Sequence, residues 1–115
     1  MIACALTAVA VLMFVAAAPS EPEKIEALIR SVAELKDAKF VRNGSAYDAA
    51  AAADHLRTKL RRAGSRVKTA DDFIRYCGSV SSQTGRAYEI RYADGRVITS
   101  EAFLRAKLAE LEARK

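Results

Sequence analysis

The chain begins with a continuous apolar segment. In the rest of the chain, apolar and polar residues alternate with the periods of helices and strands. Residues 2–18 form an uncharged, largely apolar run, which ends in three alanines before Pro19. An apolar run that ends in small residues is typical of a secretory signal peptide, so we expect residues 1–17 to be removed by cleavage between Ala17 and Ala18. The alternative is an N-terminal membrane anchor, because about 17 apolar residues reach the lower limit for crossing a bilayer.

Four segments of the body carry apolar residues at the three- and four-residue spacing of a helix with one buried face. We expect these helices at about residues 20–37, 48–64, 69–77 and 100–115. Each segment starts at a side chain that can cap a helix, namely Ser20, Asp48, Thr69 or Ser100. The apolar positions that should be buried are Ile25, Leu28, Ile29, Val32, Leu35, Ala49, Ala52, Ala53, Leu56, Leu60, Ala63, Phe73, Ile74, Cys77, Phe103, Leu104, Leu108 and Leu111.

Two other segments alternate with the period of a strand and contain a turn dipeptide. Asn43-Gly44 lies between residues that favour strands, and Asn-Gly suits the type I′ turn, which needs a positive φ at both positions. Asp94-Gly95 lies within a similar stretch over residues 87–98. Residues 78–86 form a polar loop that is too long for a simple connection, and such loops often carry function. The sequence therefore predicts two short β-hairpins and one candidate functional loop.

These elements predict an α+β fold, in which a helix-dominated domain of about four helices carries two short β-hairpins. The chain has 115 residues, which is too few for a second domain beside the leader. We therefore expect a single globular domain over residues 20–115.

Charge and cysteine content narrow the chemistry. The chain has 19 Lys and Arg against 14 Asp and Glu, which gives a net charge of +5. Without the leader, Cys77 is the single thiol, so we expect no disulfide within the domain and a buried thiol at this position. One histidine and one thiol do not make a zinc site, and no carboxylate ladder of a calcium loop is present. We therefore expect no metal and no cofactor.

Several motifs occur in an order that is more specific than any one of them. They are Phe40-Val41-Arg42-Asn43-Gly44, Tyr47-Asp48-Ala49-Ala50, His55-Leu56-Arg57 with Lys59, Lys68-Thr69-Ala70-Asp71-Asp72-Phe73-Ile74, and Ser81-Ser82-Gln83-Thr84-Gly85 with Tyr88. In this combination the chain resembles the YfeK-like family of small uncharacterised bacterial periplasmic proteins, a domain of unknown function. The family loop usually has serine where this chain has Thr84, which keeps the hydroxyl. The resemblance implies a signal peptide and a periplasmic location, and it implies no activity.

The candidate binding residues lie in the first turn, on the second predicted helix, and in or after the polar loop. They are Arg42, Asn43, Gly44, His55, Ser81, Ser82, Thr84, Gly85 and Tyr88. Neighbouring cations favour the neutral form of His55, the single histidine. One interpretation is that His55 holds the loop against the helix. Another is a small hydrolase in which His55 activates a loop serine or threonine. We assign no catalytic residue, because a triad also needs an orienting carboxylate and an oxyanion hole, and the sequence has no nucleophile elbow.

A run of basic residues follows His55 without an acid before Ala70. Its members are Arg57, Lys59, Arg61, Arg62, Arg66 and Lys68. One interpretation is a solvated face; another is binding of an anionic envelope component, such as lipid head groups, or of an acidic protein. Nucleic acid is disfavoured, because export would remove the chain from cytoplasmic DNA. Contact with a membrane is expected only if the N-terminal segment is retained.

The pattern as a whole favours a non-enzymatic accessory or binding module that is periplasmic or secreted. Its recognition surface would combine the Asn43-Gly44 turn, the loop of residues 81–85 and His55. The alternatives are the small hydrolase and an envelope factor anchored in the inner membrane and facing the periplasm. The hydrolase needs a serine or threonine oxygen within about 3.2 Å of a His55 nitrogen.

Overall fold

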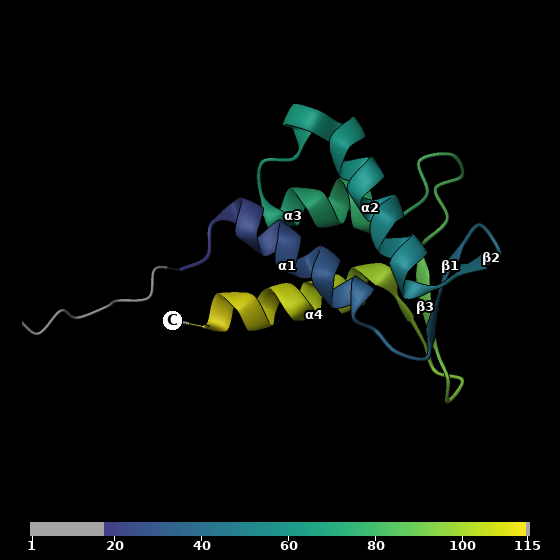
Figure 1. Cartoon of the computed structure of the whole chain (residues 1–115). Coiled ribbons are helices and arrows are strands. Elements are labelled where there is room, and N and C mark those ends of the chain that lie inside the picture. Colours follow the sequence, from purple (N-terminus) through teal and green to yellow (C-terminus); the bar gives the residue numbers. More distant parts are fainter. Residues whose placement is uncertain (1–17, 115) are drawn as a thin grey trace, which may run out of the picture.

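The computed structural model describes residues 18–114, so the predicted signal peptide or anchor at residues 1–17 lies outside the described part. The chain forms the predicted α+β fold, with helices packed together on one side and a small sheet on the other (Figure 1). No helix among residues 18–114 is long and apolar enough to cross a membrane. In chain order the elements are α1 (Glu21–Ala33), β1 (Ala38–Arg42), β2 (Ser45–Tyr47), α2 (Ala49–Ala63), the 3-10 turn η1 (Gly64–Arg66), α3 (Ala70–Phe73), the π-helical segment η2 (Ile74–Gly78), β3 (Glu89–Tyr92), β4 (Val97–Thr99) and α4 (Ser100–Ala113).

Helix α1 begins at its predicted cap and ends earlier than predicted. The Ser20 hydroxyl accepts a hydrogen bond from the Glu23 amide at 3.3 Å. The helix ends at Ala33, and Asp37 adopts a left-handed φ of 54° just before β1. The predicted end near Asp37 is wrong. Leu35 packs against the core from beyond the end of the helix, so the helical spacing of apolar residues continues past the last helical residue.

Helix α2 agrees with the prediction at both ends and buries one residue that the pattern left unplaced. The Asp48 carboxylate accepts a 2.8 Å hydrogen bond from the Ala51 amide, and Gly64, with a φ of 54°, ends the helix. The helix packs against α1 and β1. Lys59 is buried beside the alanines, with 8% of its surface exposed. The buried residues of α2 are Ala52, Ala53, Leu56, Lys59 and Ala63.

The third helical segment opens as predicted and then changes its period. Thr69 and Asp72 form a reciprocal capping box, in which each side chain accepts a hydrogen bond from the backbone amide of the other. After α3 the chain continues as the π-helical segment η2, which ends at Gly78. The Cys77 thiol is fully buried, as predicted, and burial raises its pKa. This segment packs against α2 and α4 and carries the chain to the polar loop.

The two predicted hairpins form and are joined into one antiparallel sheet with strand order β2-β1-β3-β4. Asn43 and Gly44 have φ values of 51° and 80°, as the predicted turn between β1 and β2 requires. The sequence did not predict the pairing of β1 with β3, in which Phe40 lies opposite Ile90. Both side chains are buried under the helices, so this pairing connects the sheet to the core.

Helix α4 begins one residue earlier in the chain than predicted. The Thr99 hydroxyl, rather than that of Ser100, caps the helix by accepting a 3.1 Å hydrogen bond from the Ala102 amide. The predicted cap is wrong because Ser100 is already the first helical residue and is only 3% exposed. Its amide donates to the Tyr88 carbonyl at 2.8 Å, which ties the start of α4 to the end of the polar loop.

Candidate functional site

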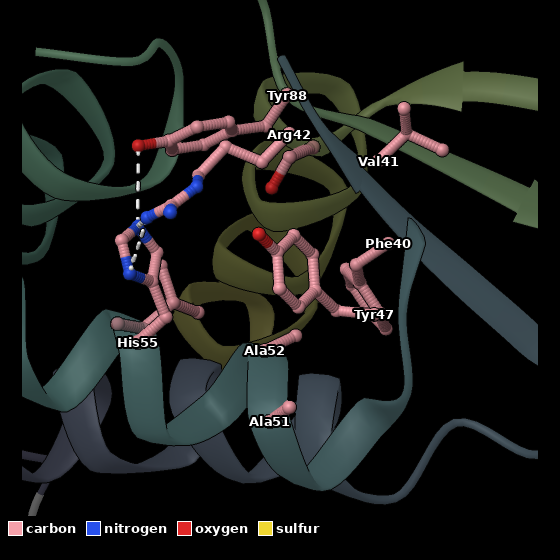
Figure 2. A pocket seen from close by; sticks show the side chains of 10 residues that line it. Phe40, Val41, Arg42, Tyr47, Ala51, Ala52, His55 and Tyr88 are labelled. Carbon is pink, nitrogen blue, oxygen red and sulfur yellow. Dashed lines mark hydrogen bonds between the residues drawn. The ribbon is translucent and has the colours of Figure 1, made fainter. Parts of the chain in front are cut away.

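Three side chains from distant parts of the chain meet where the sheet approaches α2. Arg42 ends β1, His55 lies in the middle of α2, and Tyr88 directly precedes β3. The Arg42 Nη1 atom lies 2.9 Å from His55 Nδ1 and 3.0 Å from Nε2, and the Tyr88 hydroxyl lies 3.3 Å from Nε2 (Figure 2). A neutral imidazole has one unprotonated nitrogen that can accept a hydrogen bond from Arg42, whereas a protonated ring has none.

Lys59 lies one turn after His55 on α2 and fixes the same tyrosine. Its ammonium donates to the Tyr88 hydroxyl and to the Val80 carbonyl, each at 2.9 Å. An ammonium has three N–H donors, so one remains without an acceptor among residues 18–114. The positive charge of Lys59 is therefore held in place by neutral oxygens, and no carboxylate of the described residues forms a salt bridge with it.

The surroundings keep His55 neutral, as its neighbours in the sequence predicted. Partial burial is the largest cause that lowers the pKa of His55 from its ordinary value, and the positive charges of Arg42, Lys59 and Arg62 lower it further. All of these effects disfavour a second proton on the ring. At neutral pH the uncharged imidazole can therefore accept a hydrogen bond from Arg42, and it adds no positive charge to those of the neighbouring cations.

A basic cavity of about 270 Å³ opens between α2 and the polar loop. His55, Lys59 and Arg62 contribute to it because residues four and seven positions apart lie on one side of a helix, and Arg66 joins them from the 3-10 turn η1 that follows α2. The cavity contains no Asp or Glu, although its wall has four cationic side chains. Its lining consists of Arg42, His55, Lys59, Arg62, Ala63, Arg66, Tyr76, Ser81, Ser82, Gln83 and Tyr88.

Hydrogen bonds to Asn43 hold the polar loop at the edge of the basic cavity. The side-chain amide Nδ2 of Asn43 donates to the Ser81 hydroxyl at 3.0 Å, and its side-chain oxygen accepts from the Thr84 hydroxyl at 2.6 Å. Within the loop, the Gly85 amide donates to the Ser81 carbonyl at 2.9 Å. The turn of the first hairpin thereby sets the position of a loop that is about 40 residues away in the sequence.

The predicted binding residues therefore lie in different parts of the site. Five of them line the basic cavity, namely Arg42, His55, Ser81, Ser82 and Tyr88. Asn43 and Thr84 instead connect the turn to the loop. Gly44 and Gly85 have positive φ values of 80° and 73° and no atoms within 4 Å of an added Cβ, so they shape turns and line neither cavity.

The list of candidate binding residues left out six residues of the basic cavity. They are Lys59, Arg62, Ala63, Arg66, Tyr76 and Gln83, and of these Gln83 lies in the predicted loop of residues 81–85. The signal for three of them was present, because Lys59, Arg62 and Arg66 belong to the basic run for which anion binding was one interpretation. Tyr76 gave no such signal, since its position depends on the π-helical segment η2.

An apolar cavity of about 170 Å³ adjoins the basic cavity and shares three lining residues with it, Arg42, His55 and Tyr88. In Figure 2, His55 and Tyr47 stand on opposite sides above Ala52 on α2. The Arg42 guanidinium lies 5.5 Å from the centre of the Tyr47 ring, within the range of a cation–π contact. The complete lining is Phe40, Val41, Arg42, Tyr47, Ala51, Ala52, His55, Leu56, Tyr88 and Ser100.

The contacts of His55 bear on the hydrolase hypothesis. Within residues 18–114, no hydrogen bond joins His55 to a serine or threonine oxygen. The Ser81 hydroxyl is instead occupied by the Asn43 amide and, at 3.2 Å, by the Gln83 backbone amide. The same part of the chain has no group of three His, Cys, Asp or Glu side chains that is suited to hold a metal ion. The chemistry that this site offers is hydrogen-bond donation and positive charge.

The fold and these two cavities define a small α+β domain with a cationic site where its helices meet its sheet. The profile of a protein family described as "Family of unknown function (DUF5329)" matches residues 19–112, and the chain belongs to this family. The "Uncharacterized protein YfeK" of Salmonella typhimurium is 43% identical over 68 residues, which are 59% of this chain and 57% of that protein. The match thus spans little more than half of the relative's length. The predicted YfeK-like resemblance is confirmed, and no solved structure matches.

Proposed function

We propose that this protein is a periplasmic or secreted binding module that holds a small anion in the basic cavity. The observation that carries the proposal is the convergence of four cationic side chains on a cavity without a carboxylate. They are Arg42, Lys59, Arg62 and Arg66. The exported location is supported by the apolar leader and its small-residue end, which are features of the sequence.

An anion suits this cavity because it would neutralise charges that otherwise repel each other. Among residues 18–114, none of the four cations forms a salt bridge with a carboxylate. Lys59 is the most buried of them, and charge-assisted hydrogen bonds are strongest where water is scarce. Ser82 and Tyr76 also line the cavity, and a hydroxyl is a donor of the kind that binds phosphate oxygens.

The two other functions expected from the sequence have less support. The hydrolase lacks the contact between His55 and a loop hydroxyl on which it depends. The anchored envelope factor depends on residues 1–17, which lie outside the described part. Binding of an anion needs neither a nucleophile nor an anchor, and it uses the residues that line the cavity.

Calorimetric titration with inorganic phosphate at low ionic strength tests the proposed binding. The test variant is Arg62→Gln with Arg66→Gln, because both side chains are exposed and line the basic cavity. The control is Arg61→Gln with Lys68→Gln, which removes the same charge from exposed residues outside the cavity. We expect the test variant to bind at least about tenfold more weakly, a change of about 1.4 kcal/mol, and the control to bind almost as the unaltered protein does. No binding by the unaltered protein, or equal losses in both variants, would overturn the proposal.

The location is tested by the intact mass of the protein as its native cell produces it. Cleavage at the expected position leaves Ala18 as the first residue of protein in the exported fraction. A mass that retains residues 1–17, found in the membrane fraction, would contradict the export of a free module and support an anchor.

A further inference from the structure

The basic cavity and the apolar cavity meet at three residues that line both of them, Arg42, His55 and Tyr88, and we call these residues the shared wall. From this shared wall we infer that the ligand is an amphiphile, a small anion that carries one ring-sized apolar group. Its acidic group would lie in the basic cavity and its apolar group in the apolar cavity. This inference rests on the proposed function and adds the second half of the ligand.

The apolar cavity has the size and lining for a single ring. Its volume is about 170 Å³, and an apolar cavity of about 150 Å³ in another protein takes up benzene. Phe40 and Leu56 are buried against it, with 8% and 5% of their surfaces exposed. Ala51 and Ala52 leave open the space that larger side chains on α2 would fill.

The shared wall has donors that are free to bind an acid at the junction of the cavities. Arg42 uses Nη1 toward His55 and places its guanidinium beside the Tyr47 ring. Its remaining N–H groups have no acceptor among the residues that the structure describes. Arg42 therefore lies against both cavities and can donate to an acidic group attached to a ring.

The other two members of the wall are fixed in place. The Tyr88 hydroxyl contacts both Lys59 Nζ, at 2.9 Å, and His55 Nε2, at 3.3 Å. The imidazole and phenol rings of His55 and Tyr88 pack edge to face, with 5.9 Å between their centres. Because these contacts already fix both side chains, the ligand need not order them as it binds.

A comparison of the affinities for phenyl phosphate and inorganic phosphate distinguishes the contribution of the apolar cavity from that of the basic cavity. At about pH 8 both carry close to two negative charges, so a difference in affinity measures the phenyl group. We expect calorimetry to show phenyl phosphate binding at least about tenfold more tightly than inorganic phosphate, because its ring leaves water for an apolar cavity.

A variant in which a larger side chain fills the apolar cavity tests where the phenyl group binds. Ala51→Phe places a ring at an exposed helix position that lines the apolar cavity, and Ala50→Phe makes the same change at an exposed neighbour that lines neither cavity. We expect Ala51→Phe to lose the advantage of phenyl phosphate and to keep the affinity for inorganic phosphate, while Ala50→Phe keeps both.

The outcomes distinguish this inference from the proposed function. Equal binding of the two phosphates overturns the amphiphile and leaves anion binding intact. An advantage of phenyl phosphate that survives Ala51→Phe also overturns it, since the ring then lies elsewhere. Failure of both phosphates to bind the unaltered protein overturns the proposed function and this inference with it.

Discussion

The three charged groups that shift the pKa of His55 are all positive. Burial and the charges of Arg42, Lys59 and Arg62 lower its pKa from the ordinary value of 6.5. The unfolded chain therefore takes up this proton more readily than the folded chain as the pH falls below about 6.5. The contribution of His55 to stability is complete above that pH and is lost as the pH falls through the lowered pKa.

Replacement of His55 by glutamine is expected to remove this loss. Urea unfolding at pH 7.5 and pH 5 gives the free energy of unfolding of both proteins, and the unaltered protein should lose more stability on acidification than His55→Gln does. The variant itself controls for the carboxylates, which titrate equally in both proteins. Parallel losses in the two proteins would show that His55 takes up its proton as freely in the folded state as in the unfolded one.

Burial of individual residues could be predicted where it followed the helical stripe and failed where it depended on a distant partner. Ala52, Leu56 and Ala63 lie on the buried face of α2 as expected. Lys59 shares that face, although a lysine there gives no sign of being buried. Its burial depends on the Val80 carbonyl and the Tyr88 hydroxyl, which approach only after the loop has folded onto α2. The sequence shows the charge of such a residue and does not show the acceptors that stabilise it.

At the level of elements, the first hairpin and the polar loop are joined by one side chain. Asn43→Gly keeps the positive φ of the turn and removes the bonds to Ser81 and Thr84. We expect the free energy of unfolding to fall by about 1 to 2 kcal/mol and the amides of the loop to exchange faster with solvent. Ser45→Gly, at an exposed strand position next to the same turn, is the control. Unchanged exchange in the loop of Asn43→Gly would show that Asn43 does not hold it.

The approach of η2 to α4 depends on the absence of a side chain at Gly78. A Cβ added there would lie 2.5 Å from Leu104 Cδ1, and Leu104 is fully buried. Gly78→Ala should therefore lower the free energy of unfolding by about 1 to 3 kcal/mol in urea denaturation. Leu104→Ala removes the opposing methyl groups, so the double variant should lose less than the sum of the two single losses. Strict additivity would contradict the close contact.

Local signals predicted the ends of elements where a side chain does the capping. Asp48 and the pair of Thr69 and Asp72 occupy the cap positions that their types indicate. The start of α4 was misplaced because Thr99 and Ser100 are both capping residues, and tertiary contacts of Ser100 decide between them. The π-helical turn of η2 has no local signal at all, since it follows from how the segment packs against α2 and α4.

For the whole molecule, the fold class followed from the pattern, whereas the arrangement that creates the site did not. The sequence predicted two hairpins and did not indicate that β1 and β3 pair, because their paired residues are 48 to 54 positions apart and no local pattern links them. That pairing brings Arg42 and Tyr88 together above α2. The candidate residues could thus be named from their chemistry, while their division between a basic and an apolar cavity needed the structure.

Binding of an anion should also appear as a stability that depends on salt. A ligand that binds only the folded state raises the midpoint of thermal unfolding, and added salt weakens contacts between exposed charges. Inorganic phosphate should therefore raise the melting temperature at low ionic strength, and about 0.5 M sodium chloride should reduce most of that rise. The Arg62→Gln and Arg66→Gln double variant should show a smaller rise at both salt concentrations. An equal rise in the double variant would mean that phosphate stabilises the protein from elsewhere.

The most direct test of anion binding in the basic cavity uses the single histidine of the chain as a reporter. The pH titration of the His55 imidazole, followed by nuclear magnetic resonance with and without saturating inorganic phosphate, measures the charge that this ring experiences. A phosphate among Arg42, Lys59 and Arg62 offsets the positive charges that lower the pKa of His55, so the account predicts a higher pKa when phosphate is bound. The same His55 pKa in the presence and absence of phosphate would contradict it.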